Sequence, residues 1–129
     1  MKLLIDTNAY SDFMRGNDQA VQHVKNAEQL FMSPFVIGEL LYGFRNGQLF
    51  ERNKEQLDRF MTMPVVGLLP VTLSTSDRYS RIAADLRKKG HPIPTNDIWI
   101  AAHAMESGLE LLSKDKHFKE VAGLVVRAL

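Results

Sequence analysis

The sequence contains no cysteine among its 129 residues. Disulfide bridges, thiolate zinc sites and cysteine nucleophiles are therefore excluded, and the absence fits a reducing cytoplasm. No apolar run approaches the roughly 20 residues that a membrane-spanning helix needs. The opening stretch MKLLIDTNAY has too short an apolar run before Asp6 to be a signal peptide. We therefore expect a cytoplasmic protein without membrane contact.

The remaining composition is that of an ordinary globular domain, with 45% hydrophobic and 24% charged residues. No internal repeat, low-complexity tract or Pro/Gly/Ser linker divides the chain, so we expect a single domain over residues 1–129. The net charge is +1, but Lys and Arg are concentrated in Arg78–Lys89 and Lys114–Lys119. Such segments can present a positive surface to a polyanion, or they can be solvated faces.

Short apolar runs of strand length alternate with longer segments of helical character. We predict strands at 2–6, 30–33, 65–71, 109–113 and 124–129. We predict helices at 7–15, 17–28, 34–45, 50–62, 74–89 and 95–108, and a helical turn at 116–122. Ser74 or Thr75, and Thr95 or Asn96, are the expected N-caps of the last two helices. The alternation indicates an α/β fold, in which a mostly parallel sheet of four or five strands lies between layers of helices.

Four carboxylates stand at positions that such a sheet brings together. Asp6 follows the first strand, Asp97 lies in the first turn of a helix, and Asp115 follows the strand 109–113. Because ligand sites in these sheets form at the carboxyl ends of the strands, we expect all three at one edge. Glu39 lies near the same edge within the apolar segment FVIGELLYGF, where an ionised carboxylate is costly unless it is paired or binds a cation.

Each acid has an ordinary structural explanation when taken alone. Asp6 would cap the next helix, Asp97 and Asp115 would be first-turn acids favoured by the helix dipole, and the helical glutamate would pair with Lys or Arg. Together, the four would repel one another strongly unless one or two divalent cations shielded them. Oxygen ligands suit Mg²⁺ or Mn²⁺. The histidines show no HxH or HExxH spacing, so we do not expect zinc, and His103 is expected to be an ordinary helix or core residue.

Carboxylate-bound cations at this edge predict phosphodiester hydrolysis, because they activate water and stabilise the leaving oxygen. Lys114 and Lys116, on either side of the last acid, are candidates for holding the phosphates. The helix face bearing Arg87, Lys88 and Lys89 would extend this basic track along the nucleic-acid backbone. The sequence therefore predicts a metal-dependent nuclease.

Three stretches in order along the chain resemble the motifs of PIN domains, and specifically of VapC-type toxins of type II toxin–antitoxin systems. They are LLIDTN, SPFVIGELLYG and IPTNDIWIAAHAMESGLELLSKDKHF. The resemblance covers essentially the whole chain. It implies a three-layer α/β/α PIN domain and an Mg²⁺- or Mn²⁺-dependent endoribonuclease. It also implies a homodimer and a cognate VapB-type antitoxin whose tail covers the groove.

By this resemblance, four acids form the catalytic metal site: Asp6, Glu39, Asp97 and Asp115. Thr7 and Ser113 match the family's small hydroxyl positions and would orient metal waters or a phosphate. Asn96 adds an amide beside Asp97, as a site member or a cap. The aromatic residues Phe44, Phe50 and Phe60 are candidates for a partner surface, with ordinary core packing as the alternative.

Three other kinds of function stay open on the sequence. A phosphoacceptor module of receiver type has a similar alternation, but it would carry an acidic pair after its first strand, where Thr7 and Asn8 follow Asp6. A phosphatase of the haloacid dehalogenase type would need an acid in place of Asn8. An inactive PIN-like RNA-binding scaffold is opposed by the complete set of acids.

Overall fold

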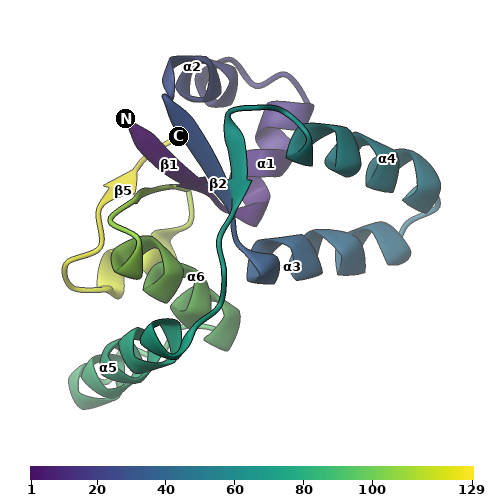
Figure 1. Cartoon of the computed structure of the whole chain (residues 1–129). Helices are drawn as coiled ribbons and strands as arrows, with labels where there is room; N and C mark the ends of the chain where they lie inside the picture. The colour runs from purple at the N-terminus through teal and green to yellow at the C-terminus, as the bar shows by residue number, and fades with distance from the viewer.

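The computed structural model describes residues 1–129, which form an α/β fold with a five-stranded sheet (Figure 1). The strands are β1 (Lys2–Ile5), β2 (Gln29–Met32), β3 (Val66–Leu68), β4 (Glu110–Leu112) and β5 (Val126–Arg127). The helices are α1 (Thr7–Met14), α2 (Asp18–Asn26), α3 (Pro34–Arg45), α4 (Phe50–Met61), α5 (Leu73–Lys89) and α6 (Thr95–Glu106), with a 3₁₀ turn η1 (Lys116–Glu120). The predicted fold class is confirmed.

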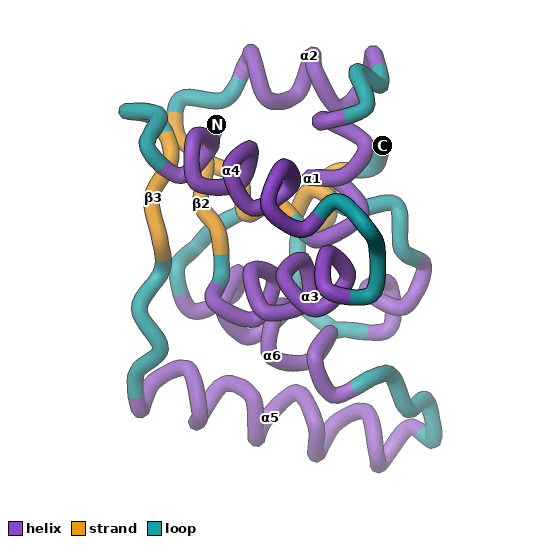
Figure 2. Tube along the Cα trace, turned by 90° about the vertical axis from the view of Figure 1, so that its right-hand side faces the viewer, coloured by secondary structure: helices purple, strands orange, loops and turns teal.

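The strand order is β3-β2-β1-β4-β5, and every neighbouring pair is parallel. The chain adds β2 and β3 on one side of β1 and then crosses over to add β4 and β5 on the other. Because such crossovers are right-handed, the helices divide between the two faces of the sheet. Figures 1 and 2 show α1, α2 and α4 on one side and α5 and α6 on the other, with α3 leading away from the end of β2. The switch in strand order at β1 makes its carboxyl end the expected ligand site.

The centre of the sheet is also the centre of the core. Leu3, Leu4 and Ile5 are fully buried, because β1 is covered by helices on both faces. Helix α6 is buried nearly all round and packs against β4. None of the helices has the length and apolar character to cross a membrane.

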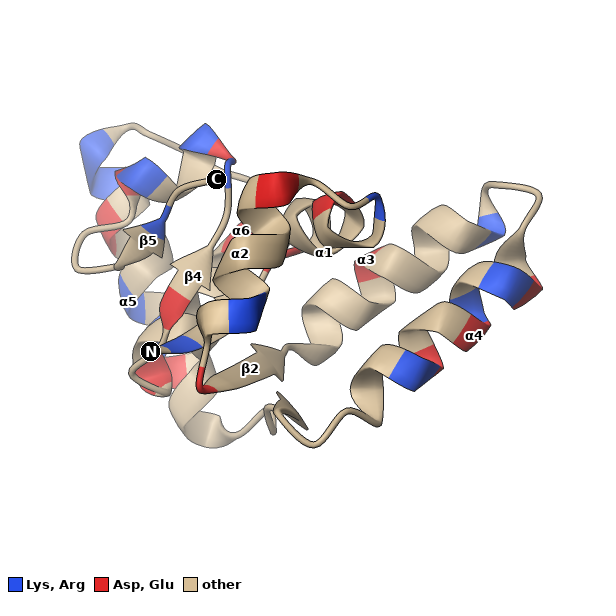
Figure 3. Ribbon diagram, turned by 90° about the horizontal axis from the view of Figure 1, so that it is seen from above, with Lys and Arg blue, Asp and Glu red and all other residues tan.

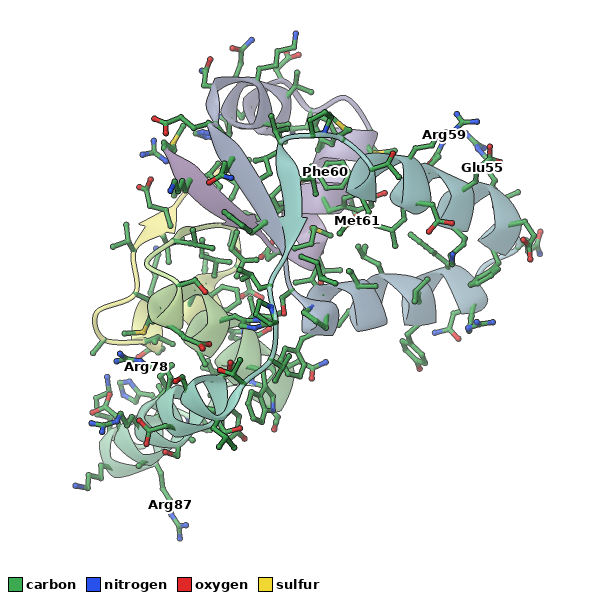
Figure 4. All side chains as sticks on the ribbon, viewed as in Figure 1. Glu55, Arg59, Phe60, Met61, Arg78 and Arg87 are labelled. Atoms are coloured by element: carbon green, nitrogen blue, oxygen red, sulfur yellow. The ribbon has the colours of Figure 1, made fainter.

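Helix α3 begins as predicted. Ser33 is its N-cap, with an Oγ that accepts a hydrogen bond of 3.1 Å from the backbone N–H of Phe35, and Pro34 occupies the first turn. The next helix, α4, turns Phe60 inward, where its ring meets the ring of Tyr10 edge-on at 5.2 Å (Figure 4). Phe60 is therefore core rather than a partner surface.

Some predictions of local structure are wrong. The strand predicted at 65–71 as a buried one covers only Val66–Leu68 and is half-exposed, since it pairs with β2 alone and lies between Pro64 and Pro70. The N-cap of α5 is Thr72, whose N–H donates to the Oγ1 of Thr75 at 3.0 Å, and not Ser74 or Thr75. The other element ends lie within a few residues of those predicted.

The start of α6 also differs from the prediction. The helix begins at Thr95 directly after Pro94, and neither Thr95 nor Asn96 serves as its cap. Proline fixes the extended backbone that precedes the first turn, so the helix starts here without a side-chain hydrogen bond.

His103 is an ordinary core residue, as expected from the sequence. It is fully buried in α6, with its Nε2 2.9 Å from the carbonyl oxygen of Pro70 and its Nδ1 2.9 Å from Ser33 Oγ. Because a carbonyl can only accept, Nε2 carries the proton and Nδ1 accepts from the serine hydroxyl. The imidazole thus ties α6 to the start of α3 and to the chain after β3.

We predict that His103→Ala lowers the free energy of unfolding by about 2–4 kcal/mol, since it leaves a cavity and removes the hydrogen bonds of the imidazole to Ser33 and Pro70. Urea denaturation measures this loss. The matched control His23→Ala, in a half-buried position on α2, should change stability by less than about 0.5 kcal/mol. Equal losses in the two variants would contradict the role given to His103.

Candidate active site

Asp6 follows the central strand and is 4% exposed. Its Oδ1 accepts a hydrogen bond of 2.8 Å from the backbone N–H of Ala9, so the residue is indeed the N-cap of α1. Its own N–H donates to the carbonyl oxygen of Leu112 at 3.3 Å, which brings the ends of β1 and β4 together. The cap gives Oδ1 of this buried carboxylate a hydrogen-bond partner, but no lysine, arginine or histidine pairs with its charge.

Asp97 and Asp115 reach the same edge of the sheet from α6 and from the turn after β4. One ligand atom from each of these acids and one from His117 lie within 4.8 Å of one another. The imidazole Nδ1 of His117 is 3.1 Å from Asp97 Oδ2 and 3.2 Å from Asp115 Oδ1. Asp115 is held by its own N–H, which donates to Ser113 Oγ at 3.0 Å, and by the N–H of His117 at 2.9 Å.

Glu39 comes to this edge on α3 and is half-buried. Its Oε1 accepts a hydrogen bond of 2.7 Å from Thr7 Oγ1, the residue after Asp6. The partner is a hydroxyl rather than a lysine or arginine, so the charge of Glu39 is not neutralised by an ion pair. Thr7 thereby links the glutamate of α3 to the carboxyl end of β1.

Burial and mutual repulsion shift the ionisation of these groups. Burial raises the pKa of Asp6 to about 6, with smaller increases from Asp115 and Asp97, against hydrogen bonds from Ser113 and Ala9 that lower it. Burial also raises the pKa of Asp97, to which Asp115 and Glu39 add, while His117 lowers it. Carboxylates that raise one another's pKa in this way gain stability from a bound cation.

The residues present fit a divalent cation. The site offers carboxylate oxygens from four separate segments and one imidazole nitrogen, and its acids are partly withdrawn from water. Hard cations such as Mg²⁺ prefer oxygen ligands of this kind. Asp97, Asp115 and His117 are near enough to share one ion, with Asp6 and Glu39 beside them.

His117 is the one site residue that sequence reasoning missed. A search for metal ligands by HxH or HExxH spacing passes over it, because its partners are Asp115, two residues earlier, and Asp97, which is twenty residues away. The Asp-x-His spacing in SKDKHF is the only local signal. Of the supporting residues that were predicted, Ser113 is buried and contacts the acids, whereas Asn96 is exposed.

The basic residues expected to hold the substrate are less closely associated with the acids. Lys114 Nζ lies 2.9 Å from Asp12 Oδ2, and Asp12 also binds Arg15 at 2.7 Å. The Lys114 ammonium, the largest influence on Asp12, holds the pKa of that carboxyl below its usual range. Lys114 is therefore already paired, whereas Lys116, on the other side of Asp115, is exposed and makes no ion pair.

The helix face of α5 shows a similar division. Lys89 pairs with Asp85 at 2.9 Å and donates to the carbonyl oxygen of Glu120 at 3.0 Å, so it lies against η1. Arg87 points away from the rest of the molecule (Figure 4), and Lys88 is exposed. The structure thus does not bring Arg87 to the acids.

Two open grooves border the acidic site. One has a volume of about 590 Å³ and lies between α3 and the start of α6, lined by Thr7, Pro34, Phe35, Gly38, Glu39, Tyr42 and Asn96. The other, of about 480 Å³, lies between residues 113–119 and the C-terminal segment. Its charged side chains are Lys114, Asp115, Lys116 and Lys119, and the rest of its lining is mostly apolar. The acids therefore stand between an aromatic groove and a basic one.

We predict that Asp6→Asn stabilises the metal-free protein. The pKa of Asp6 is raised from 3.8 to about 6, so the folded state binds more protons than the unfolded state between these values. Protonation of Asp6 stabilises the folded state fully at pH 3.8 and below, and this stabilisation is lost as the pH rises through 6. Asparagine keeps the oxygen that caps α1 and removes the charge, so we expect a gain of about 2 kcal/mol at pH 7.5.

Thermal unfolding in EDTA at several pH values tests this expectation. The advantage of Asp6→Asn should shrink as the pH falls towards 4, and MgCl₂ should stabilise the wild type more than the variant. An advantage that does not change with pH would contradict the origin assigned to it.

Comparison with known proteins agrees with this geometry. The family model of the PIN domain matches residues 3–124. The chain is 31% identical to the ribonuclease VapC2 of Haemophilus influenzae over 127 residues, covering 96% of this chain and 95% of that protein. It is 27% identical, with the same coverage, to the tRNA(fMet)-specific endonuclease VapC of Shigella flexneri.

A solved structure with the same fold is that of VapBC2 from Rickettsia felis bound to a DNA fragment from its promoter. It matches 100% of this chain and 99% of that chain with a TM-score of 0.89, at 24% sequence identity. The parallel order of the sheet, the acids at its switch point and the near-complete family match lead to one assignment. This chain belongs to the PIN-domain family and, within it, to the VapC ribonucleases.

Proposed function

We propose that this chain is a divalent-cation-dependent endoribonuclease, a single PIN domain that acts as the toxin of a type II toxin–antitoxin pair. The observation that carries this proposal is the meeting of Asp6, Glu39, Asp97 and Asp115 at the switch point of the sheet. None of the four is paired with a lysine or arginine, and two of them share His117. This favours a nuclease over a PIN-like scaffold that only binds RNA.

The cation would be Mg²⁺ or Mn²⁺, as one ion or two, held by these four carboxylates with His117 at its edge. When bound, it supplies Lewis-acid stabilisation of the phosphodiester and activation of the attacking water. The chain's own part is to fix the ligands in place before the substrate arrives. Hydrogen bonds to Asp6 from Ala9 and Ser113, and to Glu39 from Thr7, perform this fixation.

Ser113 has a central place among these positioning residues. It is 1% exposed, its hydroxyl bonds to Asp6, and its Oγ accepts the N–H of Asp115. The hydroxyl of Ser113 therefore fixes the position of Asp6 relative to Asp115. These contacts favour the orienting role predicted for Ser113.

We further propose that the partner is a VapB-type antitoxin, because structures that share this fold are of VapBC complexes. A groove of about 310 Å³ between α1, α3 and α4, with both aromatic and basic side chains, is the surface that we propose for a segment of such a partner. It is lined by Tyr10, Ser11, Met14, Arg15, Phe44, Arg52, Asn53 and Gln56. Of the aromatic residues predicted for a partner surface, Phe44 lines this groove. The ring of Phe50 does not line it and instead packs under the guanidinium of Arg45.

A homodimer is the proposed assembly, with its contact along the edge of the sheet at β3. Exposed apolar side chains follow one another there: Met63, Val65, Leu68, Val71 and Leu73, the last of which is 89% exposed. Leu68 lies in β3, whose outer edge has no neighbouring strand, and the other four side chains lie before and after this strand. An exposed apolar surface at such an edge favours association with a second surface.

We expect the purified protein to cleave structured RNA only with Mg²⁺ or Mn²⁺, and we expect Asp97→Asn to lower the rate by at least about 100-fold, since it removes a charged ligand. Initial rates on a transfer RNA, the substrate class named for the Shigella relative, measure this. The control Asp58→Asn removes an exposed acid of α4 that pairs with Lys54, and it should retain full activity. Cleavage that survives EDTA or Asp97→Asn would refute the metal site.

We also expect that production of the wild type alone arrests the growth of a bacterial host, since RNA cleavage would stop translation. Asp97→Asn should relieve this arrest at an equal protein level, measured by colony counts and immunoblotting. Normal growth with the wild type would count against the toxin role, whether or not the purified protein cleaves RNA.

A further inference from the structure

The groove of about 590 Å³ beside Glu39 differs from the rest of the site in its chemistry. Its side chains include two aromatic rings, Phe35 and Tyr42, and the amide of Asn96, and no lysine or arginine lines it. Helix α3, which forms one wall, has Arg45 as its only basic residue, at its last position (Figure 3). Its volume falls within the range of about 300–1,000 Å³ typical of ligand sites.

The charges decide which part of an RNA chain suits each groove. The aromatic groove offers no positive side chain to a phosphate, whereas Lys116 and Lys119 line the groove on the far side of Asp115. The phosphate backbone is attracted to basic side chains, and unpaired bases are bound by aromatic rings and amide groups. The aromatic groove therefore fits a base, and the basic groove fits the adjoining backbone.

Tyr42 is the most exposed aromatic side chain of the molecule, with 70% of its surface accessible to solvent. It lies three residues after Glu39 on α3, so both side chains lie on neighbouring parts of one helix face. A ring so exposed contributes little to the core of the protein. Its flat surface is available to stack on a base, a contact that is tolerant of base identity.

The other aromatic ring of the groove, Phe35, lies near the start of the same helix and is held in place. Phe35 stacks on Trp99 with a ring-centroid distance of 5.1 Å and an interplanar angle of 16°, and Trp99 stacks on Tyr79 at 4.1 Å. These rings join α3, α6 and α5, which lie in this order in Figure 2. The Phe35 ring is thus held in place before any ligand enters, which lowers the entropic cost of binding.

Gly38 keeps the floor of this groove open. A Cβ built on Gly38 would meet no atom within 4 Å, so a larger side chain there would project into the groove rather than into the core. Gly43 on the same helix is equally free around its Cβ but does not line the groove. A large side chain at Gly38 should therefore block the groove without disturbing the fold, and the same change at Gly43 is the matched control.

We propose that this groove binds one unpaired nucleobase of the RNA next to the cleaved phosphodiester, by stacking on Tyr42 and by hydrogen bonding to Asn96. The proposal rests on the ribonuclease function proposed above. It assigns a binding role to Tyr42, whose exposed ring adds little to the stability of the fold.

The test measures binding separately from cleavage. In the inactive Asp97→Asn background, fluorescence anisotropy gives the Kd of a short single-stranded RNA and of versions that each lack one base. Removal of the base that enters the groove should weaken binding about 10-fold, and Tyr42→Ala should weaken binding of the intact RNA by a similar factor. For the RNA that lacks this base, Tyr42→Ala should make no further difference.

Matched variants complete the experiment. Tyr42→Phe keeps the ring and should regain most of the affinity lost in Tyr42→Ala, and Gly38→Leu should reproduce the loss by filling the groove. Gly43→Leu should bind RNA as the parent does. Thermal unfolding verifies that all of these variants are folded.

Two results would overturn the proposal: no detectable binding of the RNA by the parent, or equal losses for intact and base-lacking RNA in Tyr42→Ala. The second result would leave the groove to a protein segment. Failure of the ribonuclease proposal is separate, because it would appear as absence of metal-dependent cleavage by the wild type while base-dependent binding could still be measured.

Discussion

The site depends on one buried charge at the end of the central strand. Asp6 lies where the ends of β1 and β4 meet the start of α1, and its burial raises its pKa to about 6 even though Ala9 and Ser113 donate hydrogen bonds to it. Two further acids nearby increase this cost. A fold selected for stability alone would place an uncharged cap there, because asparagine or serine caps a helix equally well. The cation proposed to bind the four carboxylates would account for this charge.

The residues that position the acids differ from those proposed to bind the substrate. Hydroxyl groups position them: Thr7 holds Glu39, and Ser113 contacts both Asp6 and Asp115. The surfaces that we propose to bind RNA lie farther out, with lysines beyond Asp115 and aromatic rings beyond Glu39. This difference between the two sides of the site would fix the orientation of a bound RNA chain, since RNA has a charged backbone on one side and flat bases on the other.

The fold class and the position of the four acids at one edge of the sheet could be predicted because they depend on local sequence. Apolar runs mark the strands, and an acid directly after a strand or in the first turn of a helix lies at the carboxyl edge of any parallel sheet. His117 could not be found in this way, because its partner Asp97 is distant in the chain. The pairing of Lys114 with Asp12 was equally hidden, since nothing in the sequence indicates that α1 passes beside the turn after β4. The short, exposed β3 was missed because an apolar segment does not reveal whether its strand lies at the centre or the edge of a sheet.

The sequence by itself determined which residues end the strands and begin the helices, and therefore which carboxylates face the switch point. These are properties of neighbouring residues, governed by apolar runs, proline and capping side chains. Only the tertiary structure decided how strongly the acids interact, that His117 lies between two of them, and that the grooves on either side differ in charge. Distances between segments far apart in the chain set these features, and packing around β1 fixes those distances.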